Sequence, residues 1–228
     1  MSHAHFTKAT FTFLRELKEN NARDWFERNK PRFRAEVQEP AIRFVTDFAP
    51  HLGRISARFR ADPRPVGGSI FRIYRDTRFA KDKSPYKTHM GIQFRHEDGK
   101  DAHTPGYYLH VEPGTVFVGM GVWHPDAPSL KAIREHLVAD AKGWRRVTNG
   151  ARFRERFRLE GDSLVRPPAG FDAGHPLIDD LKRKDFVAVT SMSERDATKP
   201  GFLDAFTRTC RDGTPFMKWL CAALEVPF

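Results

Sequence analysis

The residues around Pro113-Gly114 constrain the fold of this chain more than any other stretch. On either side of this dipeptide stand two runs rich in β-branched and aromatic residues, YYLHVE and TVFVGMGVW. A Pro-Gly pair between two such runs is a tight-turn signal, so the runs are predicted to form an antiparallel hairpin. A two-residue turn pairs Val111 with Val116, Leu109 with Val118 and Tyr107 with Met120. The fold is therefore expected to contain an antiparallel sheet with one apolar face.

Further segments extend this sheet and flank it with helices. Short runs bounded by Gly and Pro predict additional strands at 69–75, 90–96 and 186–192. Helical spacing of apolar residues appears before residue 53, from Asp126 to about Asn149, and twice near the C-terminus. The predicted fold class is α+β, with a mainly antiparallel central sheet flanked by N-terminal and C-terminal helices. The sheet is expected to span about residues 69–123 plus the strand near 186–192, within a single domain of residues 1–228.

The second face of the predicted sheet is polar and aromatic. Alternation along the hairpin assigns to this face Tyr108, His110, Glu112, Phe117, Gly119, Gly121 and Trp123. If Phe71 and Ile73 face the core, then Arg72 and Tyr74 point to the polar face as well. Such a face, with glycines that leave room for a ligand, is a plausible binding surface. The alternative is that helices cover it and its polar groups satisfy one another.

Positive charge is concentrated around the first predicted strand. The chain carries 39 Lys and Arg against 29 Asp and Glu, a net charge of +10. Between Arg54 and Arg95 there are eleven Lys or Arg and three Asp or Glu, so this segment alone has a net charge of +8. Arginine presents a planar fork of donors that matches phosphate or carboxylate. The candidate ligand-binding residues are Arg72, Tyr74, Arg75, Asp76, Arg78, Lys83, Tyr86, Lys87, Tyr108 and Trp123.

Several other classes of protein are disfavoured by the sequence. Cys210 and Cys221 are the only cysteines, too few for a disulfide framework and without the paired spacing of a structural zinc site. The sequence contains no P-loop, no dinucleotide fingerprint and no G-x-S-x-G elbow. No apolar run is long enough for a membrane span, and the N-terminus lacks a hydrophobic signal core, so a cytoplasmic protein without membrane contact is expected.

No metal site is predicted. His110 and His124 lie roughly 23 Å apart along the hairpin at the rise of a β-strand, too far to share one ion. A site joining His103 to His124 is not favoured either, because strand signals around His103 are weak. The sequence names no cofactor.

Four ordered motifs resemble one protein family. They are NNARDWFERNK near the start, RIYRDTRFAKDKSPYKTH from Arg72 to His89, GYYLHVEPG in the hairpin and VWHPD after it. This pattern is similar to the bacterial family known as domain of unknown function 2461. The resemblance implies a single-domain bacterial protein of mixed α and β structure, and it supplies no activity.

Three functional hypotheses remain open from the sequence. The first is a binding protein for a phosphate-bearing small molecule or a nucleic acid, using the basic cluster. The second is an enzyme acting on an anionic substrate, in which arginines orient the substrate and His110 or Glu112 serves as general acid or base. The third is structural, with the cluster forming a network of salt bridges.

Overall fold

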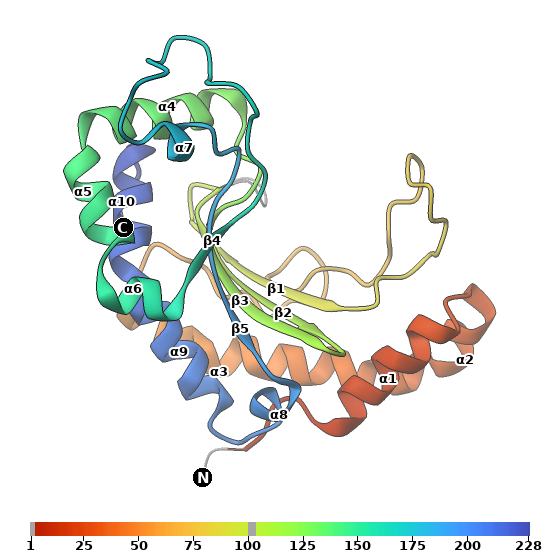
Figure 1. The fold of residues 1–228 in the computed structure, drawn as a ribbon. Helices are drawn as coiled ribbons and strands as arrows, with labels where there is room; N and C mark the ends of the chain where they lie inside the picture. The colour runs from red at the N-terminus through yellow and green to blue at the C-terminus, as the bar shows by residue number, and fades with distance from the viewer. Residues whose placement is uncertain (1–2, 100–103) are drawn as a thin grey trace.

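The computed structural model of the chain describes residues 3–99 and 104–228 and shows an α+β fold built on one antiparallel sheet (Figure 1). The five strands follow the order β1-β2-β3-β5-β4, and every neighbouring pair is antiparallel. Their bounds are β1 Met90–Arg95, β2 Gly106–Glu112, β3 Thr115–Val122, β4 Arg158–Glu160 and β5 Phe186–Met192. The predicted fold class is confirmed.

The central hairpin has the predicted register. Leu109 pairs with Val118 and Val111 with Val116, and Gly114 takes the positive φ of 79° that its turn position requires. The side chains of these apolar residues are fully or almost fully buried. The short β4 was not predicted, because its three residues span the end of the arginine-rich run ARFRERFR and the start of a segment rich in Gly, Pro and Asp.

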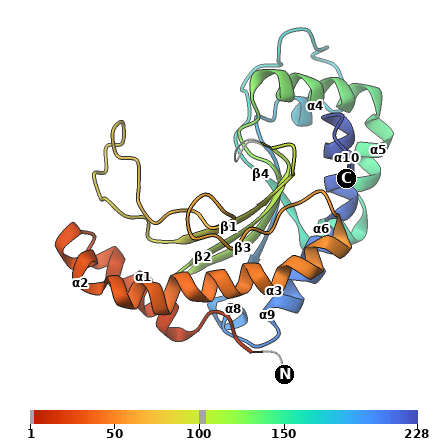
Figure 2. The same ribbon diagram turned by 180° about the vertical axis from the view of Figure 1, so that it is seen from behind.

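The N-terminal helices pack against the apolar face of the sheet. They are α1 Lys8–Glu19, α2 Arg23–Phe33, the π-helical turn η1 Arg34–Gln38, and α3 Glu39–Ile55. α3 runs across the sheet in the view from behind (Figure 2). Phe48 of α3 meets Phe94 of β1 and Phe206 of α9, with ring centroids 4.7 and 4.8 Å away. This aromatic contact joins the two ends of the chain to the sheet and makes one face a closed core.

The C-terminal helices complete the covering of that face and of one end of the sheet. Their bounds are α4 Ala127–Ala139, α5 Ala141–Thr148, α6 Ala151–Arg156, α7 Ile178–Leu181, α8 Glu194–Ala197, α9 Phe202–Asp212 and α10 Thr214–Ala223. The helix predicted to continue to Asn149 is divided at Asp140. The Asp140 carboxylate accepts from the Gly143 amide at 3.0 Å and from the Trp219 indole at 3.1 Å, so it caps a new helix. No helix in the described part of the chain has both the length and the apolar composition needed to cross a membrane.

The predicted strand at 69–75 is not a regular strand. This segment runs along the free edge of β1 and pairs through isolated bridges, Ile70 with Ile92 and Tyr74 with Tyr86. The two bridges differ in register by two residues, so the alternation of side chains is broken between them. The buried residues of this segment are Ser69, Ile70 and Ile73, which do not alternate along the chain. The period-2 assignment of the side chains was therefore wrong here, and Phe71 rather than Arg72 lies toward the polar face.

Candidate functional site

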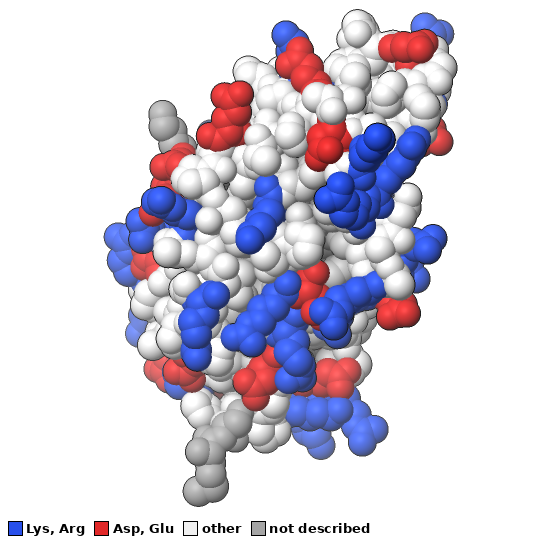
Figure 3. Space-filling model, turned by 90° about the vertical axis from the view of Figure 1, so that its left-hand side faces the viewer, with Lys and Arg blue, Asp and Glu red and all other residues white. Residues whose placement is uncertain are grey.

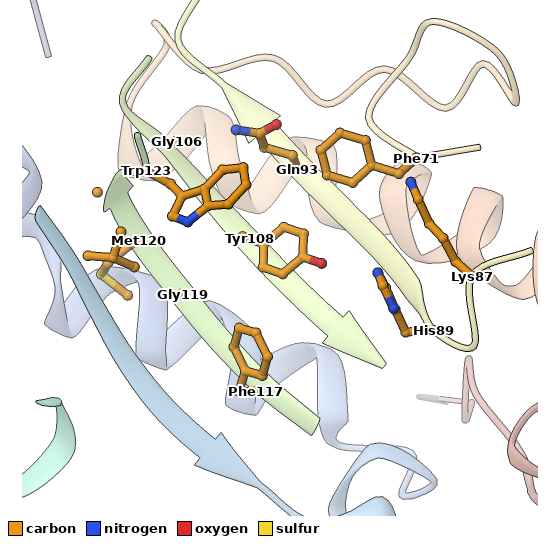
Figure 4. A pocket seen from close by; sticks show the side chains of 12 residues that line it. Phe71, Lys87, His89, Gln93, Gly106, Tyr108, Phe117, Gly119, Met120 and Trp123 are labelled. Atoms are coloured by element: carbon orange, nitrogen blue, oxygen red, sulfur yellow. The ribbon is translucent and has the colours of Figure 1, made fainter. Parts of the chain in front are cut away.

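A cleft of about 510 Å³ lies on the face of the sheet opposite the core. Strands β1, β2, β3 and β5 form its floor, and the segment along the edge of β1 forms one side (Figure 4). It is lined by Phe71, Lys87, His89, Gln93, Gly106, Tyr108, Phe117, Gly119, Met120, Gly121, Trp123 and Val187. Its volume lies within the range of pockets that hold small organic molecules.

Aromatic and glycine residues shape most of the cleft. Tyr108 pairs with Gly119 across the hairpin, so the position directly opposite it on β3 carries no side chain. A Cβ at Gly91 would lie 2.6 Å from the Tyr108 hydroxyl oxygen and 2.8 Å from the Phe71 ring, so a glycine is needed where these two rings meet. In Figure 4 the Phe71, Tyr108, Phe117 and Trp123 side chains surround the same space. The body of the cleft is therefore suited to a flat apolar group.

One end of the cleft is polar and carries a cation. The Lys87 ammonium lies 5.2 Å from the centroid of the Phe71 ring. Burial, with a smaller contribution from Arg72, lowers the pKa of Lys87. Among the described residues Lys87 has no ion-pair partner. A half-buried ammonium without a counter-ion is a group to which an anion could bind favourably.

A chain of hydrogen bonds leads from this end of the cleft into the sheet surface. The Tyr108 hydroxyl lies 3.1 Å from His110 Nδ1, and His110 Nε2 lies 3.2 Å from Glu112 Oε2. Thr88 donates its hydroxyl to Glu112 Oε1 at 2.7 Å. An ionised carboxylate only accepts, so His110 carries its proton on Nε2 and accepts the Tyr108 proton at Nδ1. The arrangement can move a proton between Tyr108 and the imidazole.

Burial and hydrogen bonding shift the pKa values of these three hydrogen-bonded side chains in different directions. It raises the pKa of Tyr108, with a further contribution from Glu112, and lowers the pKa of His110. Burial also acts to raise the pKa of Glu112, but the hydrogen bonds from Thr88 and His110 outweigh it and leave this pKa below its usual value. At neutral pH this hydrogen-bonded series therefore consists of a neutral Tyr108, a neutral His110 and an ionised Glu112.

His110 is enclosed by rings rather than by helices. It stacks between His89, with centroids 4.4 Å apart, and Phe117, with centroids 4.6 Å apart. Its side chain is 11% exposed, and neither His110 nor Glu112 lines the cleft directly. Burial and the adjacent His110 lower the pKa of His89 to about 4. His110 and Glu112, the predicted acid-base residues, therefore lie behind the wall of the cleft. Their neighbours Tyr108 and His89 line the cleft itself.

The basic loop, residues 75–85, is held mainly by contacts within itself. Arg78 makes a forked pair with Asp76, with 2.7 Å between Nη2 and Oδ2, and Arg75 pairs with Asp82. The hydrogen bond from Arg78 lowers the pKa of Asp76 to about 2, and those from Ser84 and Arg75 lower the pKa of Asp82. Lys83 donates to the carbonyl oxygen of Thr77 at 2.9 Å. These contacts are on the surface, so they shape the loop without forming a buried network.

The remaining residues of the predicted ligand set lie away from the cleft, and two of them pack against other aromatic rings. Tyr86 is 2% exposed and stacks on Phe26 with centroids 4.1 Å apart. The Asn21 side-chain amide donates to the Tyr86 carbonyl and accepts from its N–H at 2.9 and 3.0 Å. Tyr74 lies against the same two rings. Arg72 is exposed outside the cleft.

The cleft thus brings together only part of the set predicted from the sequence. Lys87, Tyr108 and Trp123 line it, whereas the other seven predicted ligand residues do not. Phe71 was missed because the predicted strand phase placed its side chain in the core. His89 comes next to His110 through the segment that precedes β1, and the sequence gives no pairing signal for that contact. Met120 and Val187 resemble ordinary strand residues in the sequence.

His124 and the distribution of charge complete the placement. His124 Nδ1 lies 3.0 Å from Asp185, far along the hairpin from His110, and His103 is outside the described residues.

Lys and Arg also gather on the face that carries α5 and α6, with Asp and Glu among them (Figure 3). The exposed basic residues of those helices are Lys142, Arg145, Arg146, Arg152, Arg154 and Arg156. Positive charge therefore does not single out the basic loop.

The comparison with known families agrees with the motifs in the sequence. A family described as "Conserved hypothetical protein (DUF2461)" matches residues 9–219 of the chain. The chain belongs to this family. No curated protein and no solved structure matches the chain. The family description names no ligand and no reaction, so the function must be argued from the site.

Proposed function

We propose that this protein binds a small organic anion in the cleft, with a flat apolar body between the aromatic walls and the anionic group at Lys87. The observation that carries the proposal is the half-buried Lys87 ammonium, which has no counter-ion among the described residues, at the polar end of an otherwise apolar cavity. A phosphate or a carboxylate fits this end. The proposal retains the anionic ligand predicted from the sequence and moves its place from the basic loop to the sheet.

A small molecule is favoured over a nucleic acid because of what the basic loop does with its own charges. Arg75 and Arg78 each pair with an aspartate of the same loop, and a nucleic acid would have to compete with both. Nucleic-acid binding needs many cations that are free to contact successive phosphates. The cleft instead offers one half-buried cation beside an apolar volume, which suits a single anionic group.

The test uses 1-naphthyl phosphate as the ligand, with 1-naphthol and inorganic phosphate as its separate halves. Isothermal titration is expected to show that 1-naphthyl phosphate binds more tightly than either half. Lys87→Met keeps the apolar stem and removes the charge, and it should weaken binding about ten- to hundredfold, the magnitude of one hydrogen bond to a charged group. Lys81→Met, an exposed loop change of equal charge, is the matched control and should bind as the wild type does.

A second variant blocks the cavity itself. Gly119 has only ordinary contacts around a built Cβ, at 3.7 Å or more, so Gly119→Val fits the strand and fills the cleft floor. It should abolish binding of 1-naphthyl phosphate, whereas Gly53→Val, with no atom within 4 Å of its built Cβ, should leave it intact. Unchanged affinity in Lys87→Met and Gly119→Val, together with loss in Arg75→Ala and Lys83→Ala, would return the ligand to the basic loop and contradict the proposal.

Acid-base catalysis is a second candidate, favoured by the hydrogen-bonded chain from Tyr108 through His110 to Glu112. In this reading Tyr108 exchanges a proton with a bound substrate, His110 takes or returns that proton, and Glu112 orients the imidazole. Hydrolysis of 1-naphthyl phosphate and 1-naphthyl acetate gives a direct assay. Saturable turnover that Tyr108→Phe and His110→Gln remove, with binding retained, supports an enzyme. A wild type that binds these esters without turning them over counts against it.

A further inference from the structure

Three side chains at the edge of the cleft form a group of the kind that holds a transition metal. His89, His110 and Glu112 each offer one ligand atom, and the three atoms lie within 4.8 Å of one another. They come from the segment before β1 and from alternate positions of β2, so the sheet fixes two of them on one face. An ion at 2.0–2.2 Å from each atom needs ligand atoms roughly 3 to 4 Å apart, a distance that side-chain rotation can reach.

We propose that His89, His110 and Glu112 bind a divalent transition-metal ion, such as Zn²⁺ or Fe²⁺. Two imidazoles and one carboxylate suit these ions better than Mg²⁺ or Ca²⁺, which prefer oxygen ligands. Three protein ligands leave further coordination positions open. Because His89 lines the cleft, those positions are available to a molecule bound there. The proposal is independent of the organic anion, since a metal can bind whether or not the cleft is filled.

The surroundings of the three ligands match what metal sites require. Metal-binding histidines commonly hydrogen-bond through their second nitrogen, and metal-binding carboxylates through their second oxygen. Here Tyr108 contacts His110 Nδ1, which leaves Nε2 for the ion, and Thr88 contacts Glu112 Oε1, which leaves Oε2. The hydrogen bond between Nε2 and Oε2 in the metal-free chain joins the two atoms that would face the ion. Binding of an ion at Nε2 would need the other neutral tautomer of His110, in which the ring proton has moved from Nε2 to Nδ1 and is donated to the Tyr108 hydroxyl oxygen.

A second group of two histidines and a carboxylate serves as the internal comparison. His3, His5 and Asp47 also have ligand atoms within 4.8 Å, but the His3 side chain is 60% exposed and that of Asp47 is 39% exposed. In the proposed site the side chains of His110 and Glu112 are 11% and 21% exposed. The proposed site adjoins the cleft, whereas none of the three N-terminal residues lines it.

The experiment titrates the untagged, metal-free chain with Zn²⁺ and with Co²⁺, followed by calorimetry and by the visible absorbance of bound Co²⁺. We expect one ion per chain at this site. Glu112→Gln keeps the shape of the side chain, but its amide retains only one of the two acceptor oxygens that contact Thr88 and His110, and it is a weaker ligand. His89→Ala removes a ligand. Each should weaken binding beyond the ten- to hundredfold that loss of an outer hydrogen bond costs. Tyr108→Phe should lose about ten- to hundredfold, and the control His3→Ala should lose nothing.

Three results would overturn the proposal. The first is a wild-type chain that takes up neither ion. The second is a chain whose binding survives Glu112→Gln and His89→Ala but is lost in His3→Ala, which would assign the ion to the group of His3, His5 and Asp47. The third concerns Glu112→Gln alone. Thermal unfolding of each metal-free variant shows whether it has folded. A folded Glu112→Gln variant that binds as the wild type does is sufficient to reject the site.

Discussion

The cleft and the basic loop are neighbours that use their charged groups in opposite ways. In the loop, Arg75 and Arg78 each have an aspartate of the same loop as a partner, and these groups stay on the surface. In the cleft, Lys87 is half-buried, has no ion-pair partner among the described residues, and stands at the end of an aromatic cavity. Charged residues are closely spaced along the sequence of the loop. A charged group that lacks an ion-pair partner among the described residues, however, is in the cleft. A charge run can therefore be the segment least dependent on a ligand.

The largest expected effect tests whether Tyr86 belongs to the framework rather than to a ligand site. Tyr86→Ala removes a ring that is 2% exposed and stacked on Phe26, so it should lower the free energy of unfolding by about 3 to 5 kcal/mol. Tyr74→Ala, at a side chain 45% exposed, is the matched control and should cost about 1 kcal/mol. Urea denaturation measures both. Equal and small costs would show that Tyr86 is not a support for the loop.

A smaller effect is expected at the glycine beneath the cleft wall. Gly91→Ala places a methyl group against the Tyr108 hydroxyl and the Phe71 ring, which must then move. Such overpacking should cost about 1 to 3 kcal/mol of unfolding free energy and should also weaken binding of 1-naphthyl phosphate. Gly53→Ala in α3, where the added methyl meets nothing, is the control for both measurements. A fully stable Gly91→Ala variant with intact binding would mean that the cleft does not depend on this close approach.

The smallest effect concerns the ion pairs of the basic loop. Asp76→Asn combined with Asp82→Asn should leave the free energy of unfolding at pH 7 unchanged within error, because both pairs are exposed. A lowered carboxyl pKa contributes stability above the unfolded pKa of an aspartate, about 4, and loses it as pH falls toward the folded value. For Asp76 that value is about 2. Any residual difference between variant and wild type should therefore decrease as the pH falls below about 4.

The loop itself is expected to respond where the whole chain does not. Without their aspartates Arg75 and Arg78 are free, and limited trypsin digestion at these residues should become faster. Digestion at the wild-type rate, or a large loss of stability, would show that the ion pairs are not what holds the loop in its shape.

The fold was predictable where one local rule decided the outcome. The turn at Pro113-Gly114 and the alternation on either side set the hairpin register, and with it the face that carries Tyr108, His110 and Glu112. The strand predicted around Arg72 failed because two bridges in different registers interrupt its alternation, which no local pattern reveals. Helix α4 ends before the predicted Asn149, at a point where Asp140 accepts a hydrogen bond from the Trp219 indole, 79 residues away.

The candidate site was predictable only in the part that belongs to the hairpin. Tyr108 and Trp123 follow from alternation, and Lys87 was included through its place in the charge run. The contact between His89 and His110 joins residues 21 positions apart through a segment without regular pairing, so sequence spacing could not predict it. Metal chemistry was set aside because only His124 and His103 were considered as partners. The sequence does not show contacts between segments that are distant in the chain and not joined by regular strand pairing.

The central claim is that the ligand lies in the cleft and not on the loop. A crystal structure of the chain grown with 1-naphthyl phosphate tests it directly. We predict the naphthyl ring between Phe71, Tyr108 and Trp123, and the phosphate within hydrogen-bond distance of Lys87 Nζ. A phosphate bound by Arg72, Arg75 and Lys83, with the cleft unfilled, would contradict it.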